Sequence, residues 1–476
     1  MNLYEKRLLF VFLFSFFIAG IIVLFLRDPF GLEIRAGVFV RDILEQASYI
    51  CPTTFGEPYF DYPPLFFVLE SFFCRFCKEI SALCLALPSL LSATIIIYLV
   101  YIVGKNFYNE NTAIIASLIL FATPEFWLKA EKATLDMSLS LSCFASIMAF
   151  YNYFFLKRNL LIFLLAFLFL AASYFLKGLI GIVLIISPFI IFFILLKEYR
   201  LLCNFLFMSF LYTACLLIIH FFLLRNHFGD EIVLNILNSQ VLSRVGHQSN
   251  KPFYYYFVYL FLVFSPWFLW IFYLILKRYL TVLDVKIFKN RFTLFLICVF
   301  LGEFAPFVVA SSKHSRYLLP LFPFISLFLA SYLSRFFTLK DLTHKKSRLF
   351  LLSSIFLFFA TVLTTFAIEP FISKKESGRL FVYNTEATLS DDYIIYLYKM
   401  KKDGDGLKYA LFSKFYPANI KFLHSIDDIK HISTSGVIVT FEKDLKHLID
   451  KITFKKLITT GFIHNKKVVA LDVSKK

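Results

Sequence analysis

The feature that most constrains this chain is a series of long, uncharged hydrophobic runs. The first of them, LLFVFLFSFFIAGIIVLFL at 8–26, has the length of roughly 20 residues that a helix needs to cross a bilayer. Hydrophobic residues make up 59% of the whole sequence, above the approximately 45–50% of soluble proteins. Because isolated strands cannot satisfy their backbone in lipid, such runs predict an α-helical polytopic membrane protein.

The runs predict about eleven transmembrane helices, and the Lys and Arg residues between them predict the orientation of these helices in the membrane. If the N-terminus is inside, the cytoplasmic segments total about 50 residues and carry 17 Lys and Arg, while outer segments twice as long carry 13 up to residue 316. This density difference favours the orientation with an inner N-terminus. The expected spans are 8–26, 80–104, 112–127, 137–156, 159–176, 178–196, 201–224, 253–276, 292–311, 317–334 and 349–368.

Three segments outside the spans have a predicted structure of their own. The stretches 33–48 and 64–76 in the long first outer loop have apolar residues at helical spacing, which predicts two interfacial amphipathic helices. After residue 369 the composition becomes that of a soluble domain. We therefore expect a transmembrane domain at 1–368 and a small outer α/β domain at 369–476.

Within this tail, the spacing of polar and apolar residues predicts individual elements. SDDYIIYLYKMKK at 390–402 is predicted as a helix, because it opens with capping residues and ends in lysines. KDLKHLIDKI is predicted as a second helix. KYALFS, GVIVTFE and KKVVALDV are predicted as strands.

The net charge of +17 and the eight cysteines raise the questions of nucleic-acid binding, zinc binding and disulfide formation. The basic residues lie in short loops between hydrophobic runs, a distribution typical of membrane orientation, so we expect no nucleic-acid partner. Cys74 and Cys77 form a C-x-x-C motif with Cys51 nearby, but no second ligand pair for zinc follows. A disulfide in the outer loop and unpaired thiols remain the two alternatives.

Charged residues gather at the outer ends of the predicted spans. Asp136, Lys177, Lys313 and Arg316 all lie there, and each alone has an ordinary explanation as a helix cap or an interfacial side chain. Span counting nevertheless assigns all of them to one face. Since charges at membrane depth are costly, this grouping predicts a polar cavity on the outer side.

The outer loops add a second carboxylate, Glu33, and a further cation, Arg244. Carboxylates can take a proton from a hydroxyl, and cations can stabilise a departing phosphate. We therefore expect Glu33 and Asp136 as catalytic candidates. Lys177, Arg244, Lys313 and Arg316 are expected to bind the phosphate of a lipid-linked donor.

Six motifs in order resemble the GT-C glycosyltransferases, closest to the lipid A aminoarabinose transferase and the protein O-mannosyltransferases. The motifs are ExR at 33–35, GEPYFDYPPL at 56–65, ATLDMSL at 133–139, LKGLIG at 176–181, KPFYYY at 251–256 and SRYLLPLFP at 315–323. The resemblance implies a GT-C fold in a bacterial inner membrane with a periplasmic C-terminal domain. It implies transfer of a sugar from a polyprenyl-phosphate donor to lipid A, a glycan or a protein on the periplasmic face.

The resemblance also implies roles for single residues. Asp136, Lys177, Arg316 and Tyr317 match the family motifs unchanged, and Tyr317 is expected to contact the donor. Two positions depart from the pattern: Leu32 replaces the first of two adjacent acids, and Tyr62 replaces a lysine beside Asp61. Asp61 keeps the acid of this motif and is expected among the substrate-binding residues.

Some relatives bind a divalent metal near this loop, for which Asp61 and His247 are candidate ligands, although two ligands do not define a site. The alternatives to an enzyme are a transporter or lipid flippase, and a diverged relative without catalysis. Glu303, within a predicted span, is the residue that most favours transport.

Overall fold

The computed structural model describes residues 3–229, 251–252, 254–277, 290–309, 313–339, 344–387, 389–425, 428, 436–449 and 456–473. The chain folds into two compact units. Unit 1 comprises Met1–Ile21, Phe60–Phe66 and Pro88–Thr364, and unit 2 comprises Ile22–Tyr59, Phe67–Leu87 and Thr365–Lys476. Most of the first outer loop and the tail therefore belong to one unit. The predicted boundary at residue 369 stays a prediction.

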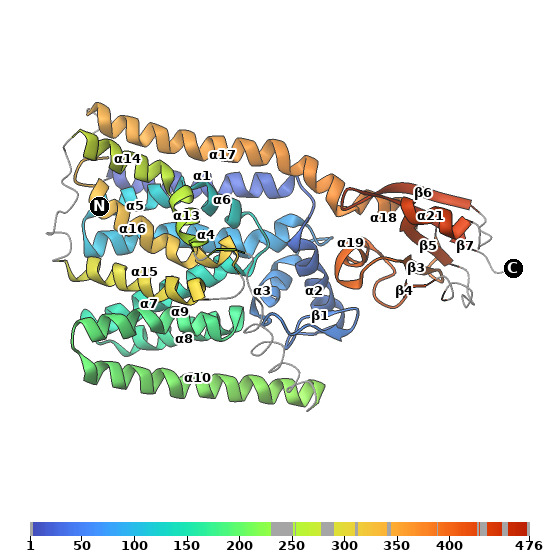
Figure 1. The fold of residues 1–476 in the computed structure, drawn as a ribbon, viewed down its shortest axis with the longest axis horizontal. Helices are drawn as coiled ribbons and strands as arrows, with labels where there is room; N and C mark the ends of the chain where they lie inside the picture. Colours follow the sequence, from blue (N-terminus) through green and yellow to red (C-terminus); the bar gives the residue numbers. More distant parts are fainter. Residues whose placement is uncertain are drawn as a thin grey trace. The chain divides into compact units, whose positions relative to one another are not determined.

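Long apolar helices dominate the described part of the chain (Figure 1). Within it, 8 helices are long and apolar enough to cross a membrane. They are α1 (Leu3–Phe25), α4 (Ala82–Phe107), α7 (Leu135–Phe155), α8 (Leu160–Lys177), α10 (Tyr199–Phe228), α15 (Arg291–Val309), the 3-10 helix η2 (Ser315–Leu321) with α16 (Phe322–Leu333), and α17 (Lys345–Ser377). These helices confirm the predicted polytopic class.

Two further predicted spans are bent helix pairs. The helices α5 (Glu110–Phe121) and α6 (Pro124–Ala130) meet at 66°, and α13 (Tyr255–Val263) and α14 (Ser265–Leu276) meet at 77°. A proline in the first turn of α6 and of α14 accounts for each new start, since proline fits that position. With α9 (Leu179–Leu195), which has 17 residues, every predicted span has a helical counterpart. The number of eleven crossings stays a prediction.

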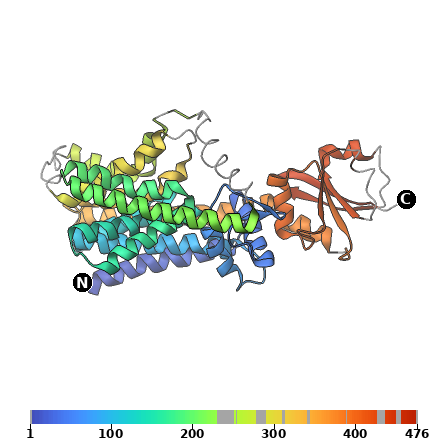
Figure 2. The ribbon, with the colours of Figure 1, turned by 90° about the horizontal axis from the view of Figure 1, so that it is seen from below.

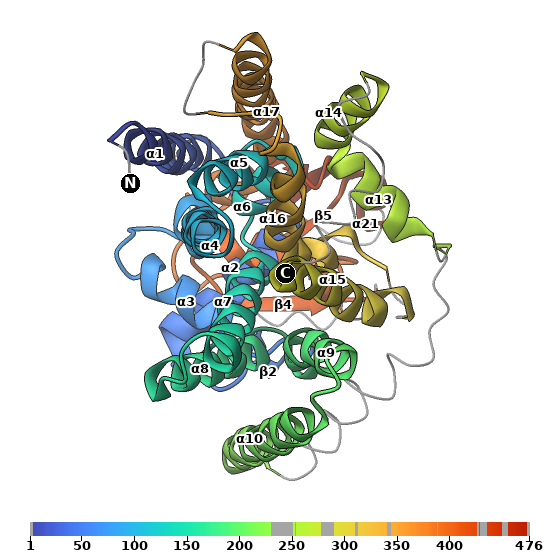
Figure 3. The same cartoon turned by 90° about the vertical axis from the view of Figure 1, so that its left-hand side faces the viewer.

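Within unit 1, α9 and α15 lie side by side (Figure 3) and approach each other closely at a glycine. A Cβ atom on Gly302 of α15 would lie 2.6 Å from the backbone nitrogen of Pro188 on α9. The Ser187 hydroxyl donates to the Gly302 carbonyl at 2.7 Å in the same place. This contact fixes α15 against α9, and α15 in turn packs on η2. The peripheral helix α10 buries few side chains.

Unit 2 contains a five-stranded mixed sheet of order β4-β3-β5-β7-β6, in orange and red in Figure 2. β3 pairs in parallel with both β4 and β5, whereas β7 pairs antiparallel with β5 and β6. The helices α18 (Arg379–Glu386), α19 (Leu407–Phe412) and α21 (Glu442–Ile449) accompany this sheet. The strands are β3 (Ile394–Tyr398), β4 (Ile420–Leu423), β5 (Gly436–Phe441), β6 (Lys456–Ile463) and β7 (Lys466–Val473).

The tail confirms the predicted α/β class but corrects two elements. The segment 390–402 contains strand β3 and no helix, because its β-branched Ile and aromatic Tyr residues favour a strand more strongly than its flanking caps favour a helix. The predicted strand KYALFS is instead helix α19. The strands GVIVTFE and KKVVALDV are confirmed, and so is the helix KDLKHLIDKI up to Ile449, while its last three residues lie outside the described residues.

The first outer loop forms helix α2 (Leu32–Gln46), a short β1–β2 hairpin (Thr53–Thr54 and Glu57–Pro58) and helix α3 (Leu65–Cys74). Both predicted loop helices are thus present. Ile34 and Val38 of α2 are buried in the hydrophobic core that they share with the β3–β5–β7 sheet. Much of the α2 surface is therefore covered by the tail of the same unit.

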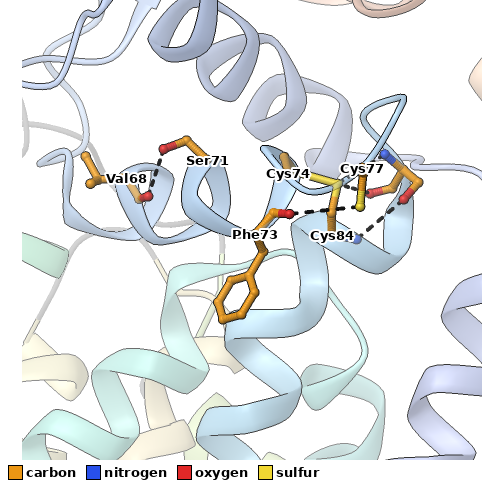
Figure 4. Close-up of a disulfide and its surroundings, with 7 residues drawn as sticks. Val68, Ser71, Phe73, Cys74, Cys77 and Cys84 are labelled. Atoms are coloured by element: carbon orange, nitrogen blue, oxygen red, sulfur yellow. Dashed lines mark hydrogen bonds between the residues drawn. A yellow bond between two sulfur atoms is a disulfide. The ribbon is translucent and has the colours of Figure 1, made fainter.

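A disulfide joins Cys74, at the end of α3, to Cys84 in the first turn of α4 (Figure 4). This bond decides between the two alternatives for the outer-loop cysteines. Cys77 follows Cys74 by one turn, and its thiol is free and exposed. Cys51 is a buried free thiol. The C-x-x-C pair is therefore not the disulfide pair.

Candidate functional site

The site in unit 1 is centred on the Asp136 carboxylate, in the first turn of α7. Thr134 precedes this helix in extended conformation, so that Asp136 lies where the helix dipole favours a negative charge. The Asp136 side chain is 2% exposed. Its Oδ1 accepts a hydrogen bond from Lys177 Nζ at 2.5 Å, and its Oδ2 lies 3.7 Å from Arg316 Nε. One buried carboxylate therefore faces two cations.

Lys177 reaches this carboxylate from the last turn of α8. Gly178 ends that helix with a positive φ of 69°, a conformation that residues with a Cβ rarely adopt. Because of this stop, the Lys177 side chain lies at the helix end and meets the start of α7. The motif LKGLIG thus provides both the cation and the glycine that places it.

Arg316 and Tyr317 come from η2, the short 3-10 helix before α16. The Lys177 ammonium lies 4.3 Å from the centroid of the Tyr317 ring, within the range of a cation–π interaction. The same ring stacks on Phe307 of α15 with centroids 5.7 Å apart. Tyr317 therefore links the Lys177 cation to the aromatic packing of the bundle.

A basic rim continues from this centre. Lys313 Nζ donates to the backbone carbonyls of Lys251 and Pro252 at 3.3 and 3.5 Å, which holds the KPFYYY motif beside η2. The backbone N–H of His314 donates to the Tyr256 hydroxyl at 3.1 Å. Burial, followed by the charges of Arg316 and Lys251, lowers the pKa of His314. The imidazole therefore lies in a field of excess positive charge.

The remaining predicted residues of unit 1 lie in the FDYPP turn. The Tyr62 hydroxyl is hydrogen-bonded to the Arg316 side chain, so this departure from the family pattern still brings a polar group to the cluster. Asp61, its neighbour, is exposed. The structure therefore brings Tyr62 to the Asp136–Lys177–Arg316 centre.

Glu33, the second predicted carboxylate, belongs to unit 2 and has a different environment. Its two oxygens accept hydrogen bonds from the Arg27 guanidinium at 2.5 and 2.7 Å, and one of them also accepts the Phe30 N–H at 3.2 Å. Arg27 Nε lies 3.1 Å from Glu369 of α17. Glu33 is 1% exposed. The structure thus shows a buried, charge-compensated Glu33.

Sequence reasoning did not identify Glu70 of α3 as a member of this unit 2 cluster. Its side chain is fully buried, and within the described chain neither carboxyl oxygen has a hydrogen-bond partner. Burial, together with the nearby Glu33 charge, raises the pKa of Glu70 well above its usual value. A single acid inside the apolar run PLFFVLESFF was the signal that could have indicated it.

Two predicted residues, Arg244 and His247, lie outside the described residues. The proposed metal pair of Asp61 and His247 thus has one described member. Within the described parts of the chain, no three His, Cys, Asp or Glu side chains are grouped so that they could hold a metal ion.

This arrangement suits the binding of an anion. The two positive charges of Lys177 and Arg316 outnumber the negative charge of Asp136 between them. Lys251 and Lys313 add further positive charge at the rim. Arg and Lys are the residues that bind phosphate groups, by hydrogen bonds and by charge. In a low-dielectric site such groups stabilise the charge that develops on a departing phosphate.

Comparison with known proteins identifies one family model and two solved structures that this chain resembles. Residues 61–224 match the family model described as dolichyl-phosphate-mannose-protein mannosyltransferase. No curated protein sequence matches the chain significantly. Two solved structures of ArnT from Cupriavidus metallidurans have the same fold, each with a TM-score of 0.78 and 97% of both chains covered. One structure, whose sequence is 12% identical to this chain, is bound to undecaprenyl phosphate. The other, 13% identical, is in the apo state.

These matches confirm the predicted resemblance and the GT-C fold. The matched family segment begins at Asp61 of the FDYPP turn and contains Tyr62, Asp136 and Lys177, which are parts of the site described above. At 12–13% identity the structural likeness establishes the fold alone. Together with the family model, it supports a membrane glycosyltransferase.

Proposed function

We propose that this protein transfers a sugar from a polyprenyl-phosphate donor to an acceptor on the periplasmic face of a bacterial inner membrane. The observation that carries the proposal is the meeting of Asp136, Lys177 and Arg316, which come from three distant segments of the sequence. The family description and the undecaprenyl phosphate bound to ArnT support the same class of donor. The acceptor is lipid A, another glycan or a protein.

In the proposed reaction an acceptor hydroxyl attacks the anomeric carbon of the donor sugar. The bond between this carbon and the phosphate oxygen breaks, and its electron pair stays on that oxygen as the polyprenyl phosphate leaves. Lys177 and Arg316 stabilise the charge of the departing phosphate. Tyr317 holds the Lys177 ammonium against its ring. Asp136 orients both cations.

The proton of the acceptor hydroxyl needs a base. Asp136 and Glu33 remain the two candidates, and their environments differ. Both Glu33 oxygens already accept hydrogen bonds from the Arg27 guanidinium, whereas Asp136 Oδ2 lies 3.7 Å from Arg316 Nε. Asp136 lies directly at the proposed phosphate site. This difference favours Asp136 for the proton transfer.

The disulfide supports the proposed side of the membrane. Disulfides persist in oxidising compartments such as the periplasm and are rare in the cytosol. Cys74 and Cys84 flank the junction between the first outer loop and α4. A periplasmic first loop agrees with the distribution of Lys and Arg in the sequence.

The proposal is tested by mass spectrometry of lipid A, glycans and envelope proteins from cells with and without this protein. We expect one sugar-sized mass difference that depends on the protein and disappears with Lys177→Met. Identical spectra from both cell types, with the protein folded and present in the membrane, would contradict the proposed transfer.

A second candidate, a lipid flippase, is favoured by the two bent helix pairs. Their breaks face each other, since Trp267 Nε1 of α14 donates to Thr123 Oγ1, between α5 and α6, at 3.2 Å. Broken helices recur at the binding sites of transporters. Movement of labelled lipid across reconstituted vesicles without any glycosylated product would favour this candidate.

A further inference from the structure

Unit 1 contains a polar cavity that the proposed transfer reaction does not use. Its volume is about 260 Å³, slightly below the roughly 300–1,000 Å³ of typical small-molecule pockets. Every lining residue is polar, which is unusual for a chain so rich in phenylalanine. The lining residues are Tyr108, Asn109, Thr112, Asn290, Thr293, Ser331, Ser334 and Arg335.

The cavity is formed by the ends of four helices. Tyr108 follows the end of α4, and Asn109 precedes α5. Asn290 precedes α15, while Ser334 follows α16. The side-chain Nδ2 of Asn111 donates to the Ser334 and Phe337 carbonyls at 3.1 and 2.8 Å, which ties α5 to the end of α16.

This cavity lies far from the Asp136 site. Thr293 lines it in the first turn of α15, whereas Phe307, near the other end of α15, stacks on Tyr317. Their separation of 14 positions in the sequence corresponds to about 21 Å along a helix. The cavity and the Asp136 centre are therefore at opposite ends of the same helix.

The hydrogen bonds around the cavity leave mainly donors available. Asn109 Oδ1 accepts the N–H of Thr112 at 2.9 Å, and Asn290 Oδ1 accepts the N–H of Phe292 at 2.9 Å. Each asparagine thus uses its acceptor to cap its own helix. Among the described residues, no hydrogen bond is made by the Nδ2 of either side chain. Both amides can therefore donate to a ligand.

The hydroxyl groups and charges of the cavity agree with this polarity. The Tyr108 and Thr293 hydroxyls are 2.8 Å apart, and the buried Thr112 hydroxyl donates to Ser334 Oγ at 2.8 Å. Arg335 brings a guanidinium, whose five N–H groups can only donate. The cavity thus combines a positive charge with spare amide N–H donors.

From this we infer a second anion site in this cavity, one that binds a phosphate group through Arg335 and the side-chain amides of Asn109 and Asn290. Guanidinium and amide N–H groups are the usual donors to phosphate oxygens. The phosphate belongs either to the headgroup of an anionic lipid in this leaflet or to a soluble phosphate.

A pair of substitutions tests the site without uncapping the helices. Asn109→Asp with Asn290→Asp keeps an acceptor for each helix N-terminus, because Asp caps as well as Asn, but replaces both amide donors by carboxylates. Arg335→Gln removes the cation. The matched control is Asn159→Asp, because Asn159 caps α8 by accepting the Leu161 N–H at 2.8 Å and lies outside the cavity.

Binding is measured on the purified full-length protein with two probes. One is inorganic phosphate, followed by ³¹P NMR in detergent, and the other is short-chain phosphatidic acid against phosphatidylcholine, followed by native mass spectrometry. We expect at least one phosphate probe to bind, with a tenfold or greater loss in the double variant and in Arg335→Gln, and no change in Asn159→Asp.

Each outcome decides a point. Binding of phosphatidic acid alone identifies a lipid headgroup, and binding of both probes or of inorganic phosphate alone identifies a site open to soluble phosphate. If neither probe binds, or if the cavity variants bind as well as wild type while their thermal midpoints are unchanged, the inference is wrong.

Discussion

Replacing Asp136 by Asn removes the one carboxylate that the structure places between Lys177 and Arg316. The two cations lie 2.5 and 3.7 Å from its oxygens, and Asp136 is almost completely buried. Asn keeps the size and a hydrogen-bonding oxygen but not the charge. The substitution therefore changes the electrostatics of the site with little change in shape.

The size of the effect follows from the burial of this pair. Removing one partner of a buried ion pair costs about 3–5 kcal/mol. Because Asn retains one hydrogen bond, we take about 3 kcal/mol as the loss in holding both cations in position. If this energy is expressed in the transition state, the rate of sugar transfer falls roughly 100-fold.

Binding and turnover should respond differently. Without the carboxylate the site keeps both cations, so we expect the variant to bind a polyprenyl phosphate at least as well as wild type. Turnover is followed by chromatography of sugar-labelled product from purified protein, and binding by native mass spectrometry. Glu45→Gln, which removes a carboxylate paired with Arg41 at 2.7 Å on α2, is the matched control. Normal turnover of a folded Asp136→Asn variant would refute the assignment.

Three further predictions concern Tyr317, the disulfide and Glu70. Tyr317→Leu should lower the transfer rate about 3–10-fold in the same assay, because it removes a cation–π contact with Lys177 worth about 0.5–2 kcal/mol, whereas Tyr317→Phe should retain most of the rate. Cys84→Ser opens the loop to Cys74 and should destabilise the protein by about 2–3 kcal/mol, measured as a lower thermal midpoint; a midpoint equal to that of wild type would contradict this. The folded-state pKa of Glu70 lies above its usual 4.5, so the native state binds more protons than the unfolded state, and wild-type stability falls as pH rises from 4.5 toward that pKa. Glu70→Gln should remove this loss of stability. A difference in thermal midpoint between wild type and Glu70→Gln that is constant between pH 5 and 8 would speak against it.

The membrane fold could be predicted because its signal is long and repeated. Each hydrophobic run has a helical counterpart, since about 20 apolar residues in lipid have few other solutions. The short elements of the tail were less predictable. The helix Leu407–Phe412 and the strand Ile394–Tyr398 are apolar segments of similar length, and they differ in that only the strand pairs with β4 and β5.

The site was predictable in part for a similar reason. Asp136, Lys177 and Arg316 lie at helix ends, and counting the spans assigns those ends to one face. The partners of Glu33 were not predictable. Its contact with Arg27 depends on the turn at Phe30 and Gly31, and Glu369 follows more than 300 residues later. The role of Cys84 as the disulfide partner of Cys74 was likewise not predictable, because a cysteine in an apolar run has the sequence pattern of a core residue.

The central claim is that Lys177 and Arg316 hold the phosphate of a polyprenyl-linked sugar while the sugar is transferred. The most direct measurement incubates the purified protein with a polyprenyl-phosphate sugar and an envelope extract, and quantifies free polyprenyl phosphate and glycosylated acceptor together. We predict that both products appear in equal amounts with wild-type protein and that both are lost with Lys177→Met. Undiminished release of polyprenyl phosphate by a folded Lys177→Met variant, or no release by wild type, would contradict the claim.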